Sequence, residues 1–496
     1  MSTLTTTITP QAGSSIALDA LGSRPNAAES LTNTVTPAGR RGRFTTTTET
    51  DNDDHPPQDD GPPPPPATPL NNKNNNNTLF KLISTGFSFF VAGVNDGSLG
   101  ALIPYVIRSY GITTALVSAL YAATLAGWLA AALTSTHLAQ RLRLGYLLGL
   151  GALLQTAAHA LRCWPPAGAP FGLFVASFFL VSLGQAYQDT FGNTFVASLS
   201  RGEKKKKEGD SVHRWLGFIH AMYMAGCLVA PFGATSIAAT GTVGTEGVGS
   251  RWWLFYTVPL SLGVVNFGLV LVAFRDMLGF VGRTRSRMQM ADASEPEGKK
   301  SASRLMKEAL NKRSVWLLSL FFFFYLGVVV TAGGWVVEYL VDVRNGDIAQ
   351  MGYVPAGFSG GGLLGRILLP EPTHRWGEKK MVSLYCVLCL GFQLLFWLVP
   401  NIIAASVAIS LLGFFSGPLF ATAISVGTRL FPADINATAI SFVFVFAQIG
   451  GSVFPMVTGV LAAHTGVSAM QPVLVGLIVA MTISWLLVPQ PKGKTK

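Results

Sequence analysis

Charged residues are scarce in this chain of 496 residues. Lys, Arg, Asp and Glu together make up 12% of it and hydrophobic residues 49%, whereas roughly a quarter of an ordinary soluble domain is charged. The sequence therefore has too few charged residues for the solvent-exposed surface of a water-soluble protein of this size. Glycine, with 53 residues, is plentiful, as membrane helices allow. This composition is typical of a membrane protein.

Cysteine and histidine are also rare, with four and seven residues. The cysteines lie in or beside apolar segments, which excludes a spaced extracellular disulfide framework. Cys386 and Cys389 form a CxxC inside a membrane-length apolar run, so we expect them to pack rather than to bind metal or carry redox chemistry. The histidines are dispersed, and the sequence has no evident nucleophile–base pair or metal-ligand cluster. We therefore expect no enzyme, no metal site and no cofactor.

From Leu79 onward the chain repeats one unit, an apolar run followed by a short polar loop. At 1.5 Å per residue, each run can cross roughly 30 Å of hydrocarbon with some tilt. The pattern predicts an all-α membrane protein whose twelve spans are Leu79–Ile107, Thr113–Leu138, Leu144–Cys163, Phe171–Ser200, His213–Ala239, Trp252–Phe274, Val315–Val341, Met351–Leu369, Met381–Val399, Ile402–Leu430, Ile435–Ala463 and Met470–Val488. The eighth crowds glycines into less than three turns, which suits close helix contact or a bend.

The longest interior loop divides these spans into two six-helix bundles, residues 79–274 and 315–489. Residues 275–314 between them form a basic linker that we expect in the cytosol. Residues 1–78 are rich in Ser, Thr, Asn and Pro and hold no long apolar run, so we expect a disordered cytosolic tail. Residues 490–496 form a short cytosolic tail.

Basic residues orient the spans. With the N-terminus inside, most Lys and Arg fall at cytosolic helix ends, loops and tails, and the outer minority is Arg108, Arg162, Arg251 and Arg344. The net charge of +11 then follows from topology and needs no nucleic-acid partner. We expect a multi-pass monomer with both termini cytosolic, in the plasma membrane by preference and otherwise in a vacuolar or other endomembrane. Its partners are the lipid bilayer and a small-molecule substrate.

Two aspartates lie within the apolar spans: Asp96 in the first and Asp189 in the fourth. A carboxylate near the middle of a membrane helix costs roughly 2.5–3.5 kcal/mol on insertion scales, so its default interpretation is functional. Gln185, Asp189 and Asn193 are spaced i, i+4, i+8 and share one helix face, which must meet protein or water. We expect both aspartates to exchange protons. The alternative is that either is held only by hydrogen bonds to a neighbouring helix.

Other polar residues in the spans are weaker candidates. His220 and Tyr223 share a face of the fifth span and suit hydrogen bonding to a substrate, but a histidine with its partners inside the bundle is an equal alternative. Gln448 suits either a cavity or an interhelical hydrogen bond. Glu338 lies near the outer surface, where we expect a gating role or an interfacial salt bridge. The predicted substrate contacts are Asn95, Gln185, Asn193, His220, Tyr223 and Gln448.

A basic loop follows the second helix of each half, at residues 137–143 and 365–380. This recurrence resembles the Major Facilitator Superfamily, whose members carry a glycine-and-arginine signature there. The first copy lacks the acidic residue and the glycine that the family usually has, whereas the second, with Gly365-Arg366, matches better. The resemblance implies a twelve-helix fold in two bundles that rock about a central site, and a gating role for Arg366.

A narrower resemblance comes from the two acidic spans. Asn95-Asp96 is similar to the Asn-Asp of the fucose permease-like proton symporters, as Asp189-Thr190 and Asn193 are to that branch's Glu-Thr-x-x-Asn, with aspartate in place of glutamate. The chain also resembles fungal members of this branch, with their long polar N-terminal tails. The resemblance implies proton exchange at Asp96 and Asp189.

We therefore predict a secondary transporter that moves a small polar solute, such as a sugar or polyol, with protons. Two alternatives remain at this point. One is an exporter of drugs or fungal metabolites by proton antiport. The other is a nutrient sensor that binds solute without moving it.

Overall fold

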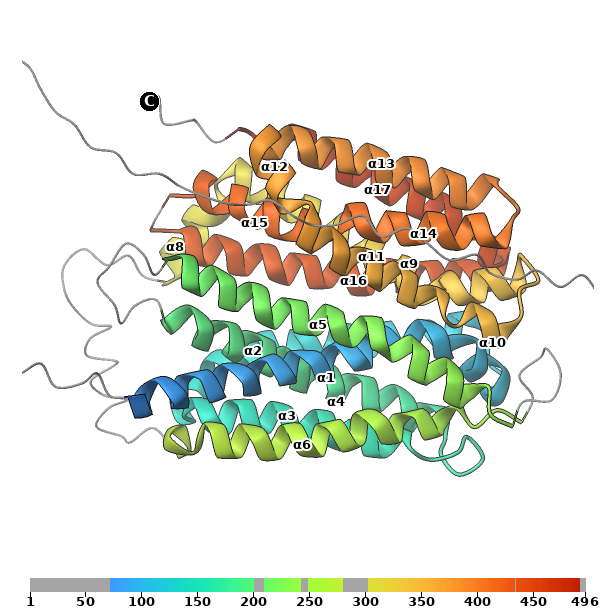
Figure 1. Ribbon diagram of the computed structural model, residues 1–496, viewed down its shortest axis with the longest axis horizontal. Coiled ribbons are helices and arrows are strands. Elements are labelled where there is room, and N and C mark those ends of the chain that lie inside the picture. The colour runs from blue at the N-terminus through green and yellow to red at the C-terminus, as the bar shows by residue number, and fades with distance from the viewer. Residues whose placement is uncertain (1–71, 200–208, 242–248, 280–301, 433, 491–496) are drawn as a thin grey trace, which may run out of the picture. The chain divides into compact units, whose positions relative to one another are not determined.

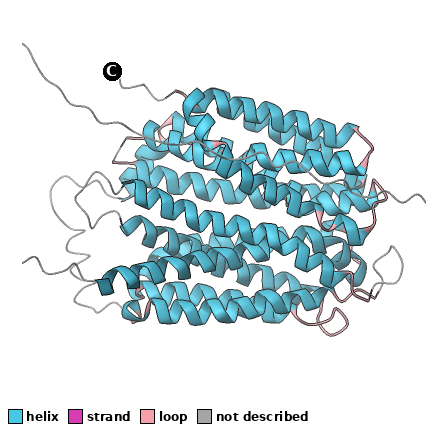
Figure 2. Cartoon of the chain, viewed as in Figure 1, coloured by secondary structure: helices cyan, strands magenta, loops and turns pink. Residues whose placement is uncertain are grey.

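The computed structural model describes residues 72–199, 209–241, 249–279, 302–432 and 434–490. All regular structure in these ranges is helical, and long helices run alongside one another (Figures 1 and 2). The predicted all-α class is confirmed. The predicted tail at residues 1–78, the linker at 275–314 and the C-terminal segment at 490–496 fall largely outside the described residues, so these boundaries stay predictions.

The helices of the first half follow the predicted spans closely. They are α1 (Asn72–Tyr110), α2 (Thr114–Arg141), α3 (Leu144–Arg162), α4 (Phe171–Ser198), α5 (Gly209–Ala238), the 3-10 helix η2 (Trp252–Tyr256), α6 (Thr257–Ala273) and the 3-10 helix η3 (Arg275–Met277). Here α1 packs on α5 and α6, α3 on α4 and α6, and α2 on α4.

The helices of the second half are more often interrupted. They are α8 (Ala302–Leu310), α9 (Arg313–Asp342), α10 (Ile348–Met351), α11 (Val354–Leu368), α12 (Pro370–Trp376), α13 (Glu378–Leu398), α14 (Ile402–Ser416), α15 (Leu419–Leu430), α16 (Asn436–Thr465), the 3-10 helix η4 (Val467–Ala469) and α17 (Met470–Leu487). Here α9 packs on α16 and α17, and α14 packs on α11 and α13. The most extensive contacts between the halves are those of α2 with α16, α5 with α11, and α1 with α9, and smaller ones join α1 with α11 and α5 with α10.

Within the described residues, eleven helical segments are long and apolar enough to cross a membrane. The eighth predicted span, residues 351–369, is the exception, because it is divided between α10 and α11. With 15 residues, α11 is about 22 Å long, which is less than the roughly 30 Å hydrocarbon core. Pro370 accounts for its end, since proline has no backbone N–H to donate to the carbonyl oxygen of Arg366, and the helical hydrogen-bond ladder is interrupted there. The predicted loop that follows contains the short helix α12.

The glycines of α11 bring it against α14. An added Cβ at Gly361 or Gly365 would collide with the backbone of α14, and one at Gly413 or Gly417 with the backbone of α11. The two helices therefore meet backbone to backbone, the close contact that the glycine pattern predicts. We call these four residues the glycine seam.

Buried amides cross-link helices inside each half. In the first half, the carbonyl oxygen of Gln188 accepts from Gln155 at 2.7 Å and from Asn266 at 3.4 Å, and Ser88 donates to Asn266 at 2.7 Å. These contacts join α1, α3, α4 and α6. In the second half, Gln393 of α13 donates to Gln471 of α17 at 2.6 Å. Such hydrogen bonds hold membrane helices together where the hydrophobic effect between them is weak.

Candidate functional site

Asp96 lies where α1, α4 and α5 meet. Its Oδ1 accepts from the side-chain amide of Asn95 at 2.8 Å, and its Oδ2 accepts from Gln185 Nε2 and from Tyr223 Oη, both at 2.8 Å. Asp96 is 14 residues from Tyr110, so it lies about 21 Å from that end of α1. Although it is deep in the helix, its side chain is exposed to a water-sized probe. The carboxylate is therefore held by donors on three helices and is open to solvent.

Asn95 connects this carboxylate to a buried arginine. Arg162, the last residue of α3, donates from Nη1 to Asn95 Oδ1 at 2.7 Å and from Nε to Ser177 Oγ at 2.7 Å. It is 2% exposed, and its guanidinium lies 3.8 Å from the ring centroid of Phe178. The sequence predicts Arg162 near the end of the third span, and the structure places it there as the last residue of α3, but its side chain is buried.

Asp189 lies one turn beyond Gln185 on α4. It is half-buried, and its Oδ1 accepts from Asn193 Nδ2 at 3.0 Å, which also donates to the backbone oxygen of Asp189 at 2.9 Å. The predicted polar stripe therefore exists as a line from Gln185, bound to Asp96, through Asp189 to Asn193. Four residues of helix separate Asp189 from Gln185, so the two lie about 6 Å apart along the axis.

His220 and Arg366 lie where the two halves face each other. The imidazole of His220 is 5.5 Å from the ring of Phe89 in its own half and 6.0 Å from that of Phe420 in the other. The guanidinium of Arg366 is 5.9 Å from the same Phe420 ring, and its buried Nε has no hydrogen-bond partner among the described residues. Arg366 is thus inside α11, beside an aromatic cluster. Gln448 of α16 is half-buried.

Glu338 of α9 faces Arg108 at the end of α1. Glu338 Oε2 lies 3.9 Å from Arg108 Nη1, so the two residues form an ion pair between the halves. Nearby, the hydroxyls of Ser236 in α5 and Tyr353 before α11 are 3.0 Å apart. An added Cβ at Gly100 of α1 would collide with the backbone of α9. We call Arg108, Glu338, Ser236 and Tyr353 the outer contact.

The opposite ends of the helices carry ion pairs that stay within one half. Lys81 Nζ of α1 lies 2.6 Å from Asp276 Oδ2 of η3, and this hydrogen bond lowers the pKa of Asp276. Glu378 of α13 pairs with Arg429 of α15. Among the described residues, the ion pairs between the halves are therefore confined to the outer contact, which indicates that the halves are closed together on that side.

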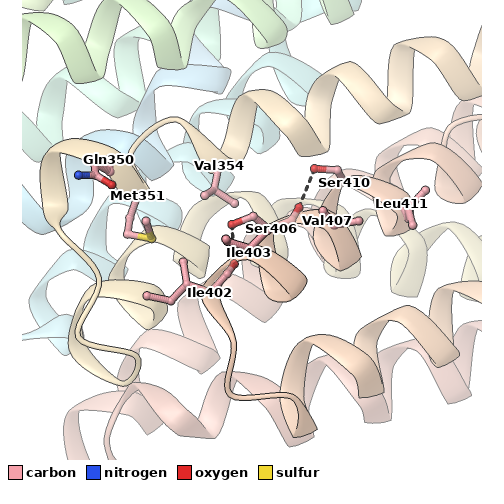
Figure 3. A pocket seen from close by; sticks show the side chains of 9 residues that line it. All are labelled: Gln350, Met351, Val354, Ile402, Ile403, Ser406, Val407, Ser410 and Leu411. Atoms are coloured by element: carbon pink, nitrogen blue, oxygen red, sulfur yellow. Dashed lines mark hydrogen bonds between the residues drawn. The ribbon is translucent and has the colours of Figure 1, made fainter. Parts of the chain in front are cut away.

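Two open hollows lie away from the aspartates. One, of about 550 Å³, is lined by residues of α10, α11 and α14 (Figure 3). Its Ser406 and Ser410 hydroxyls donate to backbone oxygens of their own helix, so their donors are already used. The other, of about 510 Å³, lies between α2, α3 and α4 and includes His137 and Arg141. Neither is lined by Asp96 or Asp189.

Metal ligands do not cluster in the part of the chain that the structure describes, where no three His, Cys, Asp or Glu side chains come together. The four cysteines are free, and Cys386 and Cys389 are buried, in agreement with the predicted packing role.

Comparison with known proteins gives a family and several relatives. The sequence profile of the Major Facilitator Superfamily matches residues 85–455 and 374–496. Bypass of stop codon protein 6 of Saccharomyces cerevisiae is 28% identical over 83% of this chain and 82% of its own. A putative glucose/galactose transporter of Helicobacter pylori is 24% identical over 64% of this chain and 74% of its own.

Solved structures show the same fold. A bacterial homologue of the human lysosomal transporter Spinster, in an inward-facing conformation, has a TM-score of 0.60 at 13% identity and covers 83% of this chain and 96% of its own. The E. coli fucose:proton symporter FucP has a TM-score of 0.56 at 16% identity and covers 83% and 99%. At these identities the likeness concerns the fold alone.

Proposed function

Because this chain belongs to the Major Facilitator Superfamily and has its multi-pass transporter fold, we propose that it carries a small polar solute, such as a sugar or polyol, across a membrane together with protons. The observation that supports this most is the Asp96 carboxylate, which is open to solvent deep in α1 and held by donors from α1, α4 and α5. Ionisable groups at such depth are costly and mark proton or solute pathways.

Protonation of Asp96 changes what its neighbours must do. As a carboxylate, its Oδ2 accepts two hydrogen bonds, from Gln185 and Tyr223. A protonated Oδ2 becomes a hydrogen-bond donor, so the side chain of at least one of these two partners must rotate and present an acceptor oxygen instead. The Gln185 amide and the Tyr223 hydroxyl can both do so. Loading a proton therefore rearranges the contacts of α1 with α4 and α5, and it frees polar groups for the hydroxyls of a bound solute.

The rest of the site supports alternating access. The outer contact joins the halves on one side, and with the predicted orientation that side is extracellular, so this conformation faces the cytosol. Asp189, one turn closer to the cytosol than Gln185, is the second proton-exchange group in our proposal. Asn95, Gln185, Asn193, His220, Tyr223 and Gln448 are the proposed substrate contacts, with Arg366 and Glu338 in gating. We further propose a monomer with both termini cytosolic, in the plasma membrane.

The name of one relative agrees with sugar transport, since it is called a putative glucose/galactose transporter. A proton-antiport exporter of drugs or metabolites is the second candidate. The aromatic rings of Phe89, His220 and Phe420 between the halves favour it, because such surfaces suit amphipathic compounds.

Proteoliposomes with an imposed pH gradient test the proposal. Radiolabelled glucose, galactose, fucose, a polyol and an amphipathic drug are offered to the wild type, to Asp96→Asn and to Glu371→Gln, an exposed acid on α12. We expect Asp96→Asn to lose accumulation driven by the gradient but to keep exchange of solute across the membrane, while Glu371→Gln behaves as wild type. Full pH-driven accumulation by Asp96→Asn would refute proton coupling at this residue.

A further inference from the structure

Arg162 is a buried cation without an ion-pair partner. Among the described residues, no carboxylate lies within 4.0 Å of its guanidinium. Its polar contacts are Asn95 and Ser177, at 2.7 Å each, and its Nη2 has no hydrogen bond. The rings of Phe178 and Tyr256, at 3.8 and 5.3 Å, supply further stabilisation through their π faces. A charge removed from water in this way needs compensation.

The hydrogen bonds lead from this cation to one anion. Asn95 accepts from Arg162 through Oδ1 and donates to Asp96 through Nδ2, at 2.7 and 2.8 Å. The amide is thereby oriented, since its oxygen must face the guanidinium and its nitrogen the carboxylate. A single side chain separates the two charges, and the buried Arg162, which is 2% exposed, favours the ionised form of Asp96 through its positive charge.

We propose that Arg162 is a positioning residue that acts through Asn95 to set the pH range over which Asp96 takes up and releases its proton. This inference rests on the proposed function, because it concerns the same proton site. A purely structural role, in which Arg162 only ties α3 to α1 and α4, is the competing explanation. The two differ in what they predict for the pH dependence of Asp96.

Other ionisable groups surround Asp96 and are the same residues in every variant. Tyr223 and Cys227 face it from α5, and Asp189 follows Gln185 on α4. His159 lies one turn before Arg162 on α3, and neither of its ring nitrogens has a hydrogen-bond partner among the residues that the structure describes.

Three further helices that contact α1 are α9, α11 and α6, and their polar groups have contacts of their own. On α9, Glu338 pairs with Arg108, which is 12 residues from Asp96, about 18 Å along α1. On α11, Arg366 faces Phe420. On α6, Asn266 is neutral and belongs to the amide cross-link. Removing the charge of Arg162 therefore leaves the other groups around the site in place.

Infrared difference spectroscopy of the full chain in proteoliposomes measures this without a known substrate. The carboxyl stretch of protonated Asp96 is identified by its loss in Asp96→Asn, and its pH midpoint is then followed in the variants. Arg162→Gln should move the midpoint by about one pH unit to the alkaline side, because the carboxylate loses its favourable cation. Arg162→Lys keeps the charge and should stay close to the wild type. Arg251→Gln, at an exposed arginine of the same outer side, should not move it.

Asn95→Ala covers the case in which Arg162→Gln does not fold. It removes the bridge while keeping the guanidinium, and should move the midpoint in the same direction by a smaller amount. Unchanged midpoints in folded Arg162→Gln or Asn95→Ala would overturn the proposal, as would equal shifts in the Gln and Lys variants. The transport proposal fails separately, if Asp96→Asn still accumulates solute on a pH gradient whatever the midpoints do.

Discussion

Replacing Glu338 with Gln should weaken the outer contact by a measurable amount. At the 3.9 Å between Arg108 Nη1 and Glu338 Oε2, Coulomb's law gives about 4 kcal/mol for an effective dielectric constant of about 20. The Glu338 side chain is 8% exposed, and its Oε2 has no hydrogen-bond partner in the described part of the chain, so desolvation offsets most of this attraction. The net stabilisation is then about 1 kcal/mol. This corresponds to a roughly fivefold change in the ratio of the inward-facing to the outward-facing conformation.

Spin labels on the two halves report this ratio. Thr113, just before α2, and Thr465, at the end of α16, are exposed on two helices that pack together across the halves. Cys163 is replaced, because it is the cysteine that is partly exposed. In pulsed electron–electron double resonance, the wild type should show mainly the short distance. Glu338→Gln should raise the share of the long distance about fivefold.

A double-mutant cycle completes this test. Arg108→Gln should act like Glu338→Gln, and the double variant should add little, because each single change already removes the pair. Glu371→Gln serves as the control at an exposed acid of α12. Distance distributions that are the same in Glu338→Gln and in the wild type, or effects that simply add, would show that the pair does not hold the halves together.

Three further predictions concern packing and stability. Gly100→Leu should favour the long spin-label distance more strongly than loss of the ion pair, because its side chain would collide with the α9 backbone; unchanged distances would contradict this. Gln393→Leu should cost about 1 kcal/mol in thermal or denaturant unfolding, because it leaves Gln471 without its 2.6 Å partner, and no loss of stability would count against the amide cross-link. The Lys81 contact lowers the pKa of Asp276, so this pair stabilises the fold above the ordinary aspartate pKa and loses its effect as the pH falls through the lowered value. Asp276→Asn should therefore reduce the melting temperature at pH 7. A difference in melting temperature that persisted near pH 2 would refute the electrostatic origin.

Most of the fold could be predicted from the sequence because membrane spans are long apolar runs, and their length is fixed by the bilayer. The place where α11 departs from that rule was also visible, as a dense group of glycines. The sequence could not show that residues 352–353 separate α10 from α11. Glycines indicate a close contact between helices, but whether the glycine-rich segment bends or is interrupted depends on the helix that packs against it.

The candidate site was predicted in part. The spacing of Gln185, Asp189 and Asn193 gave their common face, because helical periodicity alone determines it. Arg162 was missed as a site residue, since a count of basic residues only assigns it to one side of the membrane and does not indicate where its side chain points. Its acceptors, Asn95 and Ser177, lie on other helices and are distant in sequence. A signal was nevertheless present in the sequence, because the Asn95 amide and the Ser177 hydroxyl lie in apolar spans and need buried hydrogen-bond partners.

The glycine seam packs α11 and α14 together as one rigid unit. Backbones in direct contact have no side chains between them that could yield or repack, so a tilt of one helix carries the other with it. Since α11 also touches α5 of the opposite half, a displacement of α5 acts on a pair of helices that are in direct backbone contact. A bulky residue at Gly365 or Gly413 would collide with the facing backbone and separate the two helices.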